Sequence, residues 1–196
     1  MPILDAATKA ELTKLYRAAD RHYHGLRHIE ALLALLEEHR QAFADPEAVE
    51  AAIWFHDAIY DSRRKDNEPA SAELAADRLS GHVDDTRLAR IVAMIEATAT
   101  HQVPEFGDVA AQKDAALFLD MDLSILGAPA EAFDAYEAAV RREYGWVSDA
   151  DWRVGRAAVL SNFLARPRIF HTDILARRFE ARARANMQRS LEALEA

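Results

Sequence analysis

Apolar positions recur along most of the chain at the three- and four-residue spacing of amphipathic helices, and no alternating pattern typical of a strand persists. The predicted helices span about residues 8–19, 26–36, 46–57, 71–79, 84–98, 108–126, 129–144, 148–166 and 172–194. His28 lies inside the second of them, and His24 lies near its start. Proline and glycine occur six times each, so few positions interrupt a helix. The pattern predicts an all-α fold, and we expect a single compact helical domain over residues 1–196.

Two helix starts are marked by local chemistry. Asp45 stands before Pro46, which matches an N-cap acid with proline at the first helical position. Ser148 and Asp151 resemble a capping box in which aspartate replaces the usual glutamate. These two signals place the start of a helix more firmly than apolar spacing alone.

Composition excludes several classes of function. A formal net charge of -9 argues against binding to a long nucleic acid, which normally rests on a basic surface. The chain has no cysteine, so thiolate catalysis and sulfur-ligated metal centres are excluded, and any metal must be held by His, Asp and Glu. No secretory signal or spanning run is recognised, so we expect a cytoplasmic protein without membrane contact. Whether the arginine-rich last helix is a homodimer face or a solvated surface stays open.

An imidazole and a carboxylate, His56 and Asp57, stand side by side within the apolar run 54–60. Burying both groups is costly unless something pairs with them, and a metal ion would pair with both. Upstream, His24 and His28 have the i, i+4 spacing that places two imidazoles on one helix face. These histidines are therefore candidates to complete a metal site.

Two more carboxylates, Asp120 and Asp122, lie in a second apolar segment. On a helix they point about 200° apart, so both cannot face one ion. Together with His28, His56 and Asp57, one of them would form a set of nitrogen and oxygen donors suited to Mn, Fe, Co, Ni, Zn or Mg. We expect one such divalent ion per chain, which would lower the pKa of a bound water and supply hydroxide for attack on phosphorus.

Motifs along nearly the whole chain point to one family. They are Tyr23-His24-Gly25-Leu26-Arg27-His28, Trp54-Phe55-His56-Asp57-Ala58-Ile59-Tyr60-Asp61, Asp66-Asn67-Glu68 with Ser71-Ala72, Phe118-Leu119-Asp120-Met121-Asp122-Leu123-Ser124-Ile125-Leu126-Gly127, and the later Tyr136, Arg141-Arg142-Glu143-Tyr144 and Gly155-Arg156. In these motifs the chain resembles the HD-domain superfamily of metal-dependent phosphohydrolases, and more narrowly a bacterial branch described as predicted HD phosphohydrolases. The resemblance implies an HD-like helical core that hydrolyses a small phosphoester, a nucleotide or related phosphate, by metal-activated water, as a phosphomonoesterase or phosphodiesterase.

The resemblance also implies the ligand set His28, His56, Asp57 and Asp122. Asp122 is preferred over Asp120 because it matches the small-apolar-Asp-Leu pattern around the last ligand of the superfamily. Asp120 is then a surface or capping acid, or a partner that orients a ligand histidine.

A separate role is implied for His24. In related cyclic nucleotide phosphodiesterases, the first histidine of a His-x-x-x-His pair protonates the leaving oxygen, because a ligand imidazole cannot also deliver a proton from its coordinating nitrogen. We expect His24 to be a general acid or a substrate contact, and the alternative is a helix-start histidine packed against Tyr23. Asp61 and Glu68 follow the ligand helix and are candidates for the base or for positioning water.

Six further residues are candidate substrate contacts: Arg27, Asn67, His101, Arg141, Tyr144 and Arg156. A guanidinium fork suits a phosphate, although each arginine is equally a candidate for a surface ion pair. His101 stands where superfamily members with a second metal place another ligand, and His82 would have to join it. A di-iron oxygenase is therefore one alternative to the hydrolase, and a non-catalytic nucleotide-binding signalling module is another.

Overall fold

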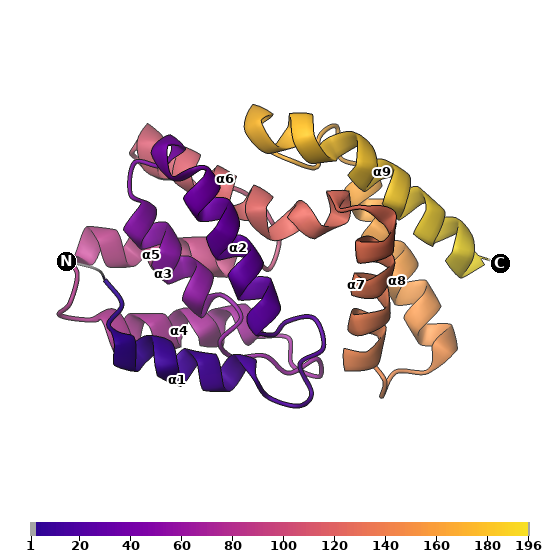
Figure 1. The fold of residues 1–196 in the computed structure, drawn as a ribbon, viewed down its shortest axis with the longest axis horizontal. Coiled ribbons are helices and arrows are strands. Elements are labelled where there is room, and N and C mark those ends of the chain that lie inside the picture. Colours follow the sequence, from indigo (N-terminus) through magenta and orange to yellow (C-terminus); the bar gives the residue numbers. More distant parts are fainter. Residues whose placement is uncertain (1–2, 196) are drawn as a thin grey trace. The chain divides into compact units, whose positions relative to one another are not determined.

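The computed structural model describes residues 3–195, which form helices joined by loops (Figure 1). The α-helices are α1 (Ala6–Tyr16), α2 (Leu26–Glu38), α3 (Pro46–Phe55), α4 (Asn67–Leu79), α5 (Asp85–Ala97), α6 (Val109–Asp122), α7 (Ala130–Glu143), α8 (Asp149–Leu164) and α9 (Asp173–Glu195). Two 3-10 helices, η1 (Arg40–Ala42) and η2 (Leu123–Gly127), lie between them. Extended pairing within the described residues is limited to one isolated bridge, Ser80 with Val83. The prediction of an all-α fold is confirmed.

Helix starts follow the capping chemistry of the sequence. The Asp45 carboxylate accepts a hydrogen bond from the Ala48 N–H at the start of α3, and Ser148 caps α8 in the same way. Helix α4 begins at Asn67, four residues earlier than its apolar spacing predicts. Pro69 does not prevent this early start, because it lies in the first turn, where a helix leaves its N–H groups unpaired.

The ligand-bearing helix α3 ends earlier than predicted. Its last residue is Phe55, His56 is the C-cap, and Asp57 lies in the following turn. The next carbonyls do not continue the helical ladder, because those of Asp57 and Ala58 accept hydrogen bonds from the Arg21 guanidinium. The adjacent imidazole and carboxylate therefore stand at the end of a helix rather than within it.

The chain forms two compact units, Met1–Met121 and Asp122–Ala196. In the first unit α3 contacts α1, α2, α4 and α5, and seven of its ten residues are buried. In the second unit η2 and α8 both contact α9. The expectation of one domain stays a prediction. Within the described residues, no helix is both long and apolar enough to cross a bilayer.

Close backbone approach joins η2 to α9 within the second unit. A Cβ placed on Gly127 would lie 2.5 Å from the Phe179 Cβ and 2.7 Å from the Phe179 carbonyl oxygen, so the contact needs glycine. Arg182 donates a hydrogen bond to the Gly127 carbonyl, and Asn186 donates to the carbonyls on either side of it. These bonds satisfy carbonyls that a 3-10 helix leaves without intrahelical partners.

Candidate metal centre

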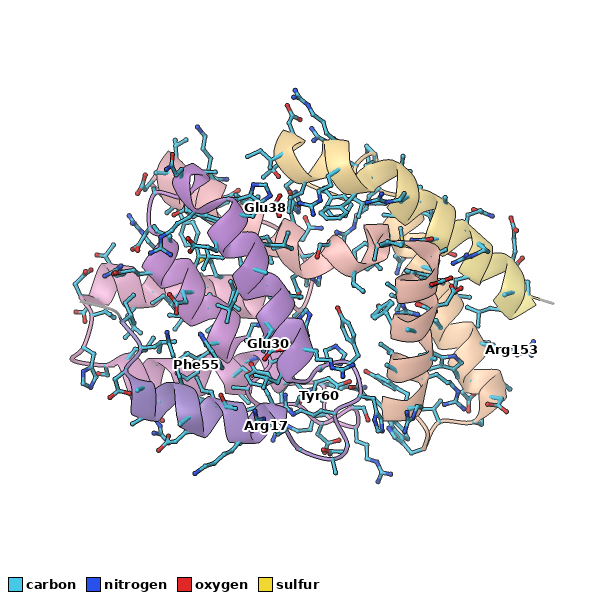
Figure 2. All side chains as sticks on the ribbon, viewed as in Figure 1. Arg17, Glu30, Glu38, Phe55, Tyr60 and Arg153 are labelled. Atoms are coloured by element: carbon cyan, nitrogen blue, oxygen red, sulfur yellow. The ribbon has the colours of Figure 1, made fainter. Side chains whose placement is uncertain are left out.

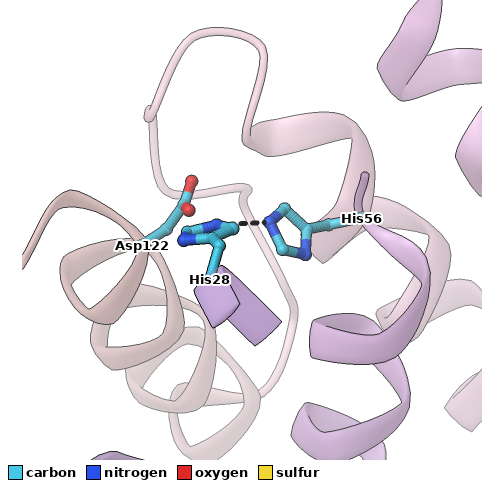
Figure 3. Close-up of side chains that lie close together, drawn as sticks. All are labelled: His28, His56 and Asp122. Atoms are coloured by element: carbon cyan, nitrogen blue, oxygen red, sulfur yellow. Dashed lines mark hydrogen bonds between the residues drawn. The ribbon is translucent and has the colours of Figure 1, made fainter. Parts of the chain in front are cut away.

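The structure brings three of the predicted ligands together from three helices (Figure 3). His28 lies in the first turn of α2, His56 caps the C-terminal end of α3, and Asp122 is the last residue of α6. Each residue offers one ligand atom, and these atoms all lie within 4.8 Å of one another. Asp122 directly follows Met121, the last residue of the first unit, and both residues belong to α6.

The spacing of the two imidazoles suits a shared ion. The Nε2 atoms of His28 and His56 lie 3.1 Å apart, and both side chains are buried. Two nitrogens at about 2.0–2.1 Å from one ion, with an angle between about 90° and 109°, would be separated by roughly 2.8–3.4 Å. The observed separation therefore fits two ligands of one ion.

Asp57 brings a carboxylate to the same two nitrogens. Its Oδ2 atom lies 3.1 Å from the Nε2 of His56 and 3.7 Å from the Nε2 of His28. Burial raises the pKa of the Asp57 carboxyl, but the neighbouring His56, His24 and His28 lower this pKa by a larger amount. The pKa of Asp57 therefore lies well below its ordinary value. Asp57 is therefore a charged carboxylate at neutral pH, the form that binds a metal ion.

The tautomer of His56 also favours a cation. Its Nδ1 lies 2.9 Å from the Ile53 carbonyl oxygen, which can only accept a hydrogen bond, so Nδ1 carries a proton. In the neutral ring Nε2 then presents the lone pair that a metal ion would bind. Ligand histidines are typically oriented by such a bond to a carbonyl or carboxylate. The helix ends favour a cation as well, because α3 and α6 both point their negative C-terminal ends towards the group. The donor set thus fits a divalent ion.

The geometry supports Asp122 over Asp120 as the fourth ligand. Asp120 is 0% exposed, yet the group that converges with His28 and His56 contains Asp122 instead. This is the outcome expected for residues that point about 200° apart on one helix.

His24 lies beside the ligands. Its ring stacks on Tyr60, with centroids 4.2 Å apart, and its centroid lies 6.4 Å from that of His28. Tyr23 contacts the rings of both histidines at 4.9 and 5.0 Å. His24 therefore packs against Tyr23 and also lies next to the ligand group, so the two alternatives do not exclude each other. The role of His24 as an acid stays a prediction.

Asn67 and Asp61 are joined through the backbone. The Asn67 amide accepts a hydrogen bond from the Asp61 N–H and donates one to the Asp61 carbonyl, while the Asp61 carboxylate accepts from the Arg63 N–H. Asn67 thus closes the loop that follows the ligand turn. Glu68 is half-buried in the first turn of α4. The catalytic and substrate roles of these residues stay predictions.

Two candidate substrate contacts in the first unit differ in their setting. Arg27 is exposed on α2. His101 follows α5 with a φ of 52°, in the left-handed region that glycine or asparagine usually occupies at a helix end, and its N–H donates to the Ala97 carbonyl. Such backbone strain is concentrated at functional sites.

Arg141, Tyr144 and Arg156 belong to the second unit, where both guanidinium groups have partners. Arg156 is buried, and it donates to the Glu137 carboxylate and, over 2.8 Å, to the Tyr136 hydroxyl. Burial lowers the pKa of Arg156, but these two partners raise it above its ordinary value. Arg141 donates to the carbonyl of Tyr144, the C-cap of α7. Their roles as substrate contacts stay predictions.

Sequence reasoning missed Arg21, although it lies only three residues before His24. Its guanidinium donates to the carbonyls of His24, Asp57 and Ala58. The signal in the sequence is weak. Arg21 stands just before a His-x-x-x-His pair, but no spacing rule predicts that its guanidinium bonds to a segment 36 residues away. Arg21 nevertheless connects the two loops that carry the predicted acid and a predicted ligand.

Across residues 3–195, the group of His28, His56 and Asp122 is the one set of three or more His, Asp or Glu side chains whose ligand atoms converge. Neither His82 nor His101, which a di-iron centre would need, belongs to it.

No family model, curated protein or solved structure matches this chain. The resemblance to HD-domain phosphohydrolases therefore rests on the motifs and enters as a proposal.

Proposed function

We propose that this protein is a metal-dependent phosphohydrolase of the HD-domain type that hydrolyses a small phosphoester such as a nucleotide. The observation that carries the proposal is the convergence of two imidazole nitrogens, of His28 and His56, with the carboxylate of Asp122. Asp57 adds a second carboxylate against the same nitrogens. The resemblance of the surrounding motifs to this superfamily supports the same chemistry.

The ligand residues are suited to hold Mn, Fe, Co, Ni, Zn or Mg, because they offer two nitrogens and two carboxylates and no sulfur. When bound, such an ion supplies Lewis-acid stabilisation of a phosphate oxygen and lowers the pKa of a coordinated water towards neutrality. Two carboxylates also offset the charge of a divalent ion, which leaves the site close to neutral and open to an anionic substrate. The Ile53 carbonyl fixes the ring of His56 for this task.

Hydrolysis transfers one proton to the leaving group. The oxygen of water adds to phosphorus, the bond from phosphorus to the leaving oxygen breaks, and that oxygen takes up a proton. We assign this proton to His24, which lies beside the ligand His28 and is held against Tyr60. Asp61 and Glu68 are the proposed groups for accepting the proton of the attacking water.

The proposal is tested by metal content per chain, measured by elemental analysis on protein purified without a histidine tag. The wild type is compared with Asp57→Ala and with Glu30→Ala. Glu30 is an exposed carboxylate of α2, labelled in Figure 2, and lies two residues after His28 in the sequence. We expect about one divalent ion in the wild type and in Glu30→Ala, and its loss in Asp57→Ala. The loaded wild type should then hydrolyse members of a panel of nucleotides and aryl phosphoesters, and Asp57→Ala should not.

Three results would overturn the proposal. Protein that takes up no metal even with added Mn or Ni would make the His-Asp cluster structural. Two irons per chain with oxygen uptake would favour the di-iron oxygenase. One ion and nucleotide binding without any hydrolysis would favour the signalling module.

A further inference from the structure

Arg21 lies in the loop between α1 and α2 and makes three hydrogen bonds to backbone carbonyls. Its Nη1 donates to the carbonyl of His24 over 3.0 Å and to that of Asp57 over 2.6 Å, and its Nη2 donates to that of Ala58 over 2.8 Å. One acceptor belongs to the loop before α2, and the other two belong to the turn after α3. The guanidinium therefore joins two irregular segments that no helical ladder holds together.

Aromatic rings fix the plane of this guanidinium. Its carbon lies 5.0 Å from the centroid of Tyr16 and 5.6 Å from that of Tyr60, and the Tyr60 ring in turn stacks on His24 (Figure 2 labels Tyr60). A planar fork that meets several acceptors and lies over aromatic rings is a property of arginine, which the point charge of lysine does not reproduce. The backbone carbonyls and the two tyrosine rings thus both restrict the orientation of the Arg21 guanidinium.

We propose that Arg21 is a positioning residue that holds the Asp57 carboxylate and the His24 ring in their places at the metal centre. The proposal rests on the proposed function, in which Asp57 is a ligand and His24 the acid. Asp57 lies outside α3, so the direction of its side chain depends on how its own backbone is held, and the bond to its carbonyl does this. The same guanidinium holds the backbone of His24.

The charge of Arg21 means that its two possible effects change the affinity for a divalent ion in opposite directions. A fixed positive charge near a cation site repels the cation, so removing the charge alone would raise the affinity for a divalent ion. If Arg21 positions a ligand, removing it lowers the affinity instead. Partners that orient metal ligands typically contribute about 10- to 100-fold to metal affinity or activity.

The experiment measures Co²⁺ affinity by calorimetry and by the visible spectrum of the bound ion. It compares the wild type with Arg21→Gln, Arg21→Lys and Arg17→Gln. Arg17 is exposed in the same loop region, four residues upstream, so Arg17→Gln removes the same charge without the three bonds (Figure 2). Circular dichroism sets a temperature at which each variant is folded.

We expect Arg21→Gln and Arg21→Lys to bind Co²⁺ at least about tenfold more weakly than the wild type. Arg17→Gln, which removes a positive charge without the three bonds, should bind it as tightly as the wild type or slightly more tightly. On an aryl phosphodiester, both Arg21 variants saturated with metal should lower kcat more than they change KM, because the acid is displaced. Should Arg21→Gln fail to fold, Arg21→Lys decides the question by the same measurements.

Unchanged or tighter Co²⁺ binding by both Arg21 variants would overturn the inference. A failure of the proposed function has a different signature, since the wild type itself would then bind no metal or hydrolyse no phosphoester. A wild type that binds Co²⁺ without hydrolysis still tests the positioning of Asp57 through the affinity of the variants.

Discussion

Asp114 gives a prediction that links the two ligand helices α3 and α6. It lies in α6 with 5% of its surface exposed, and its two carboxylate oxygens accept hydrogen bonds from the Ala44 N–H over 2.9 Å and the Asp45 N–H over 2.8 Å. These N–H groups precede α3. The carboxylate therefore fastens the start of α3 to α6, and both helices carry a predicted ligand at the opposite end.

The cost of removing this side chain can be worked from the two bonds. Hydrogen bonds to a charged acceptor contribute about 1.5–3 kcal/mol each. Asp114, Ala44 and Asp45 line a cleft of about 400 Å³, so water can replace part of the loss. Burial also raises the pKa of Asp114 against the opposing effect of the Ala44 and Asp45 N–H groups, so its charge is not fully compensated. We therefore expect Asp114→Ala to lower the free energy of unfolding by about 2 kcal/mol and Asp114→Asn, which keeps one acceptor, by about 1 kcal/mol.

Urea unfolding at pH 7, followed by circular dichroism, measures both values. About 2 kcal/mol corresponds to a fall in Tm of roughly 4–8 °C for a chain of this size. Lys113→Ala, an exposed change at the preceding position of α6, serves as the control and should stay within about 0.5 kcal/mol of the wild type. A loss below about 0.5 kcal/mol for Asp114→Ala would refute the reasoning, because two buried acceptors cannot be removed at so small a cost.

Two further predictions concern packing and pH. Gly127→Ala should lower the free energy of unfolding, measured by urea unfolding, by about 2–3 kcal/mol, because the new Cβ would meet the Phe179 backbone. Gly155→Ala in α8, where a Cβ has nothing within 4 Å, should raise the free energy of unfolding by about 0.5–1 kcal/mol. Equal effects of the two substitutions would contradict the role of close approach at Gly127. Burial raises the pKa of the Asp45 carboxyl, but the Arg87 guanidinium lowers it by more, so this pKa lies below its ordinary value of 3.8. The ion pair therefore stabilises the fold at pH values above 3.8, and this stabilisation is lost as the pH falls through the lowered pKa. Asp45→Asn, which keeps the cap, should therefore cost about 1 kcal/mol at pH 7 and progressively less below pH 4, and a cost independent of pH would exclude the ion pair as its cause.

Local rules explain what the sequence predicted correctly. The start of α3 follows from Asp45 and Pro46, because the cap bond to the Ala48 N–H and the fixed φ of proline act within their own helix. Apolar spacing is sufficient to place the other helices within a few residues. The cluster of His28, His56 and Asp122 was predictable in kind, because buried imidazoles and carboxylates need a partner. The choice of Asp122 came from the family resemblance, and the geometry supports it.

Contacts between distant residues explain what the sequence did not predict. The bond from Arg21 to Asp57 spans 36 residues, and the bond from the Ala44 N–H to Asp114 spans 70. Such side-chain bonds to the backbone follow no periodic rule. The pairing of buried Arg156 with the Glu137 carboxylate spans 19 residues and follows no such rule either.

The early end of α3 brings the adjacent imidazole and carboxylate of the candidate metal centre together. Adjacent residues within a helix point about 100° apart, so a helix that continued through His56 and Asp57 would direct their side chains away from each other. The helix stops at Phe55 instead, and the turn brings the Asp57 Oδ2 within 3.1 Å of the His56 Nε2. A turn leaves carbonyls without helical partners, and the guanidinium of Arg21 satisfies two of them. The arginine and the break in the helix are thus two parts of one arrangement.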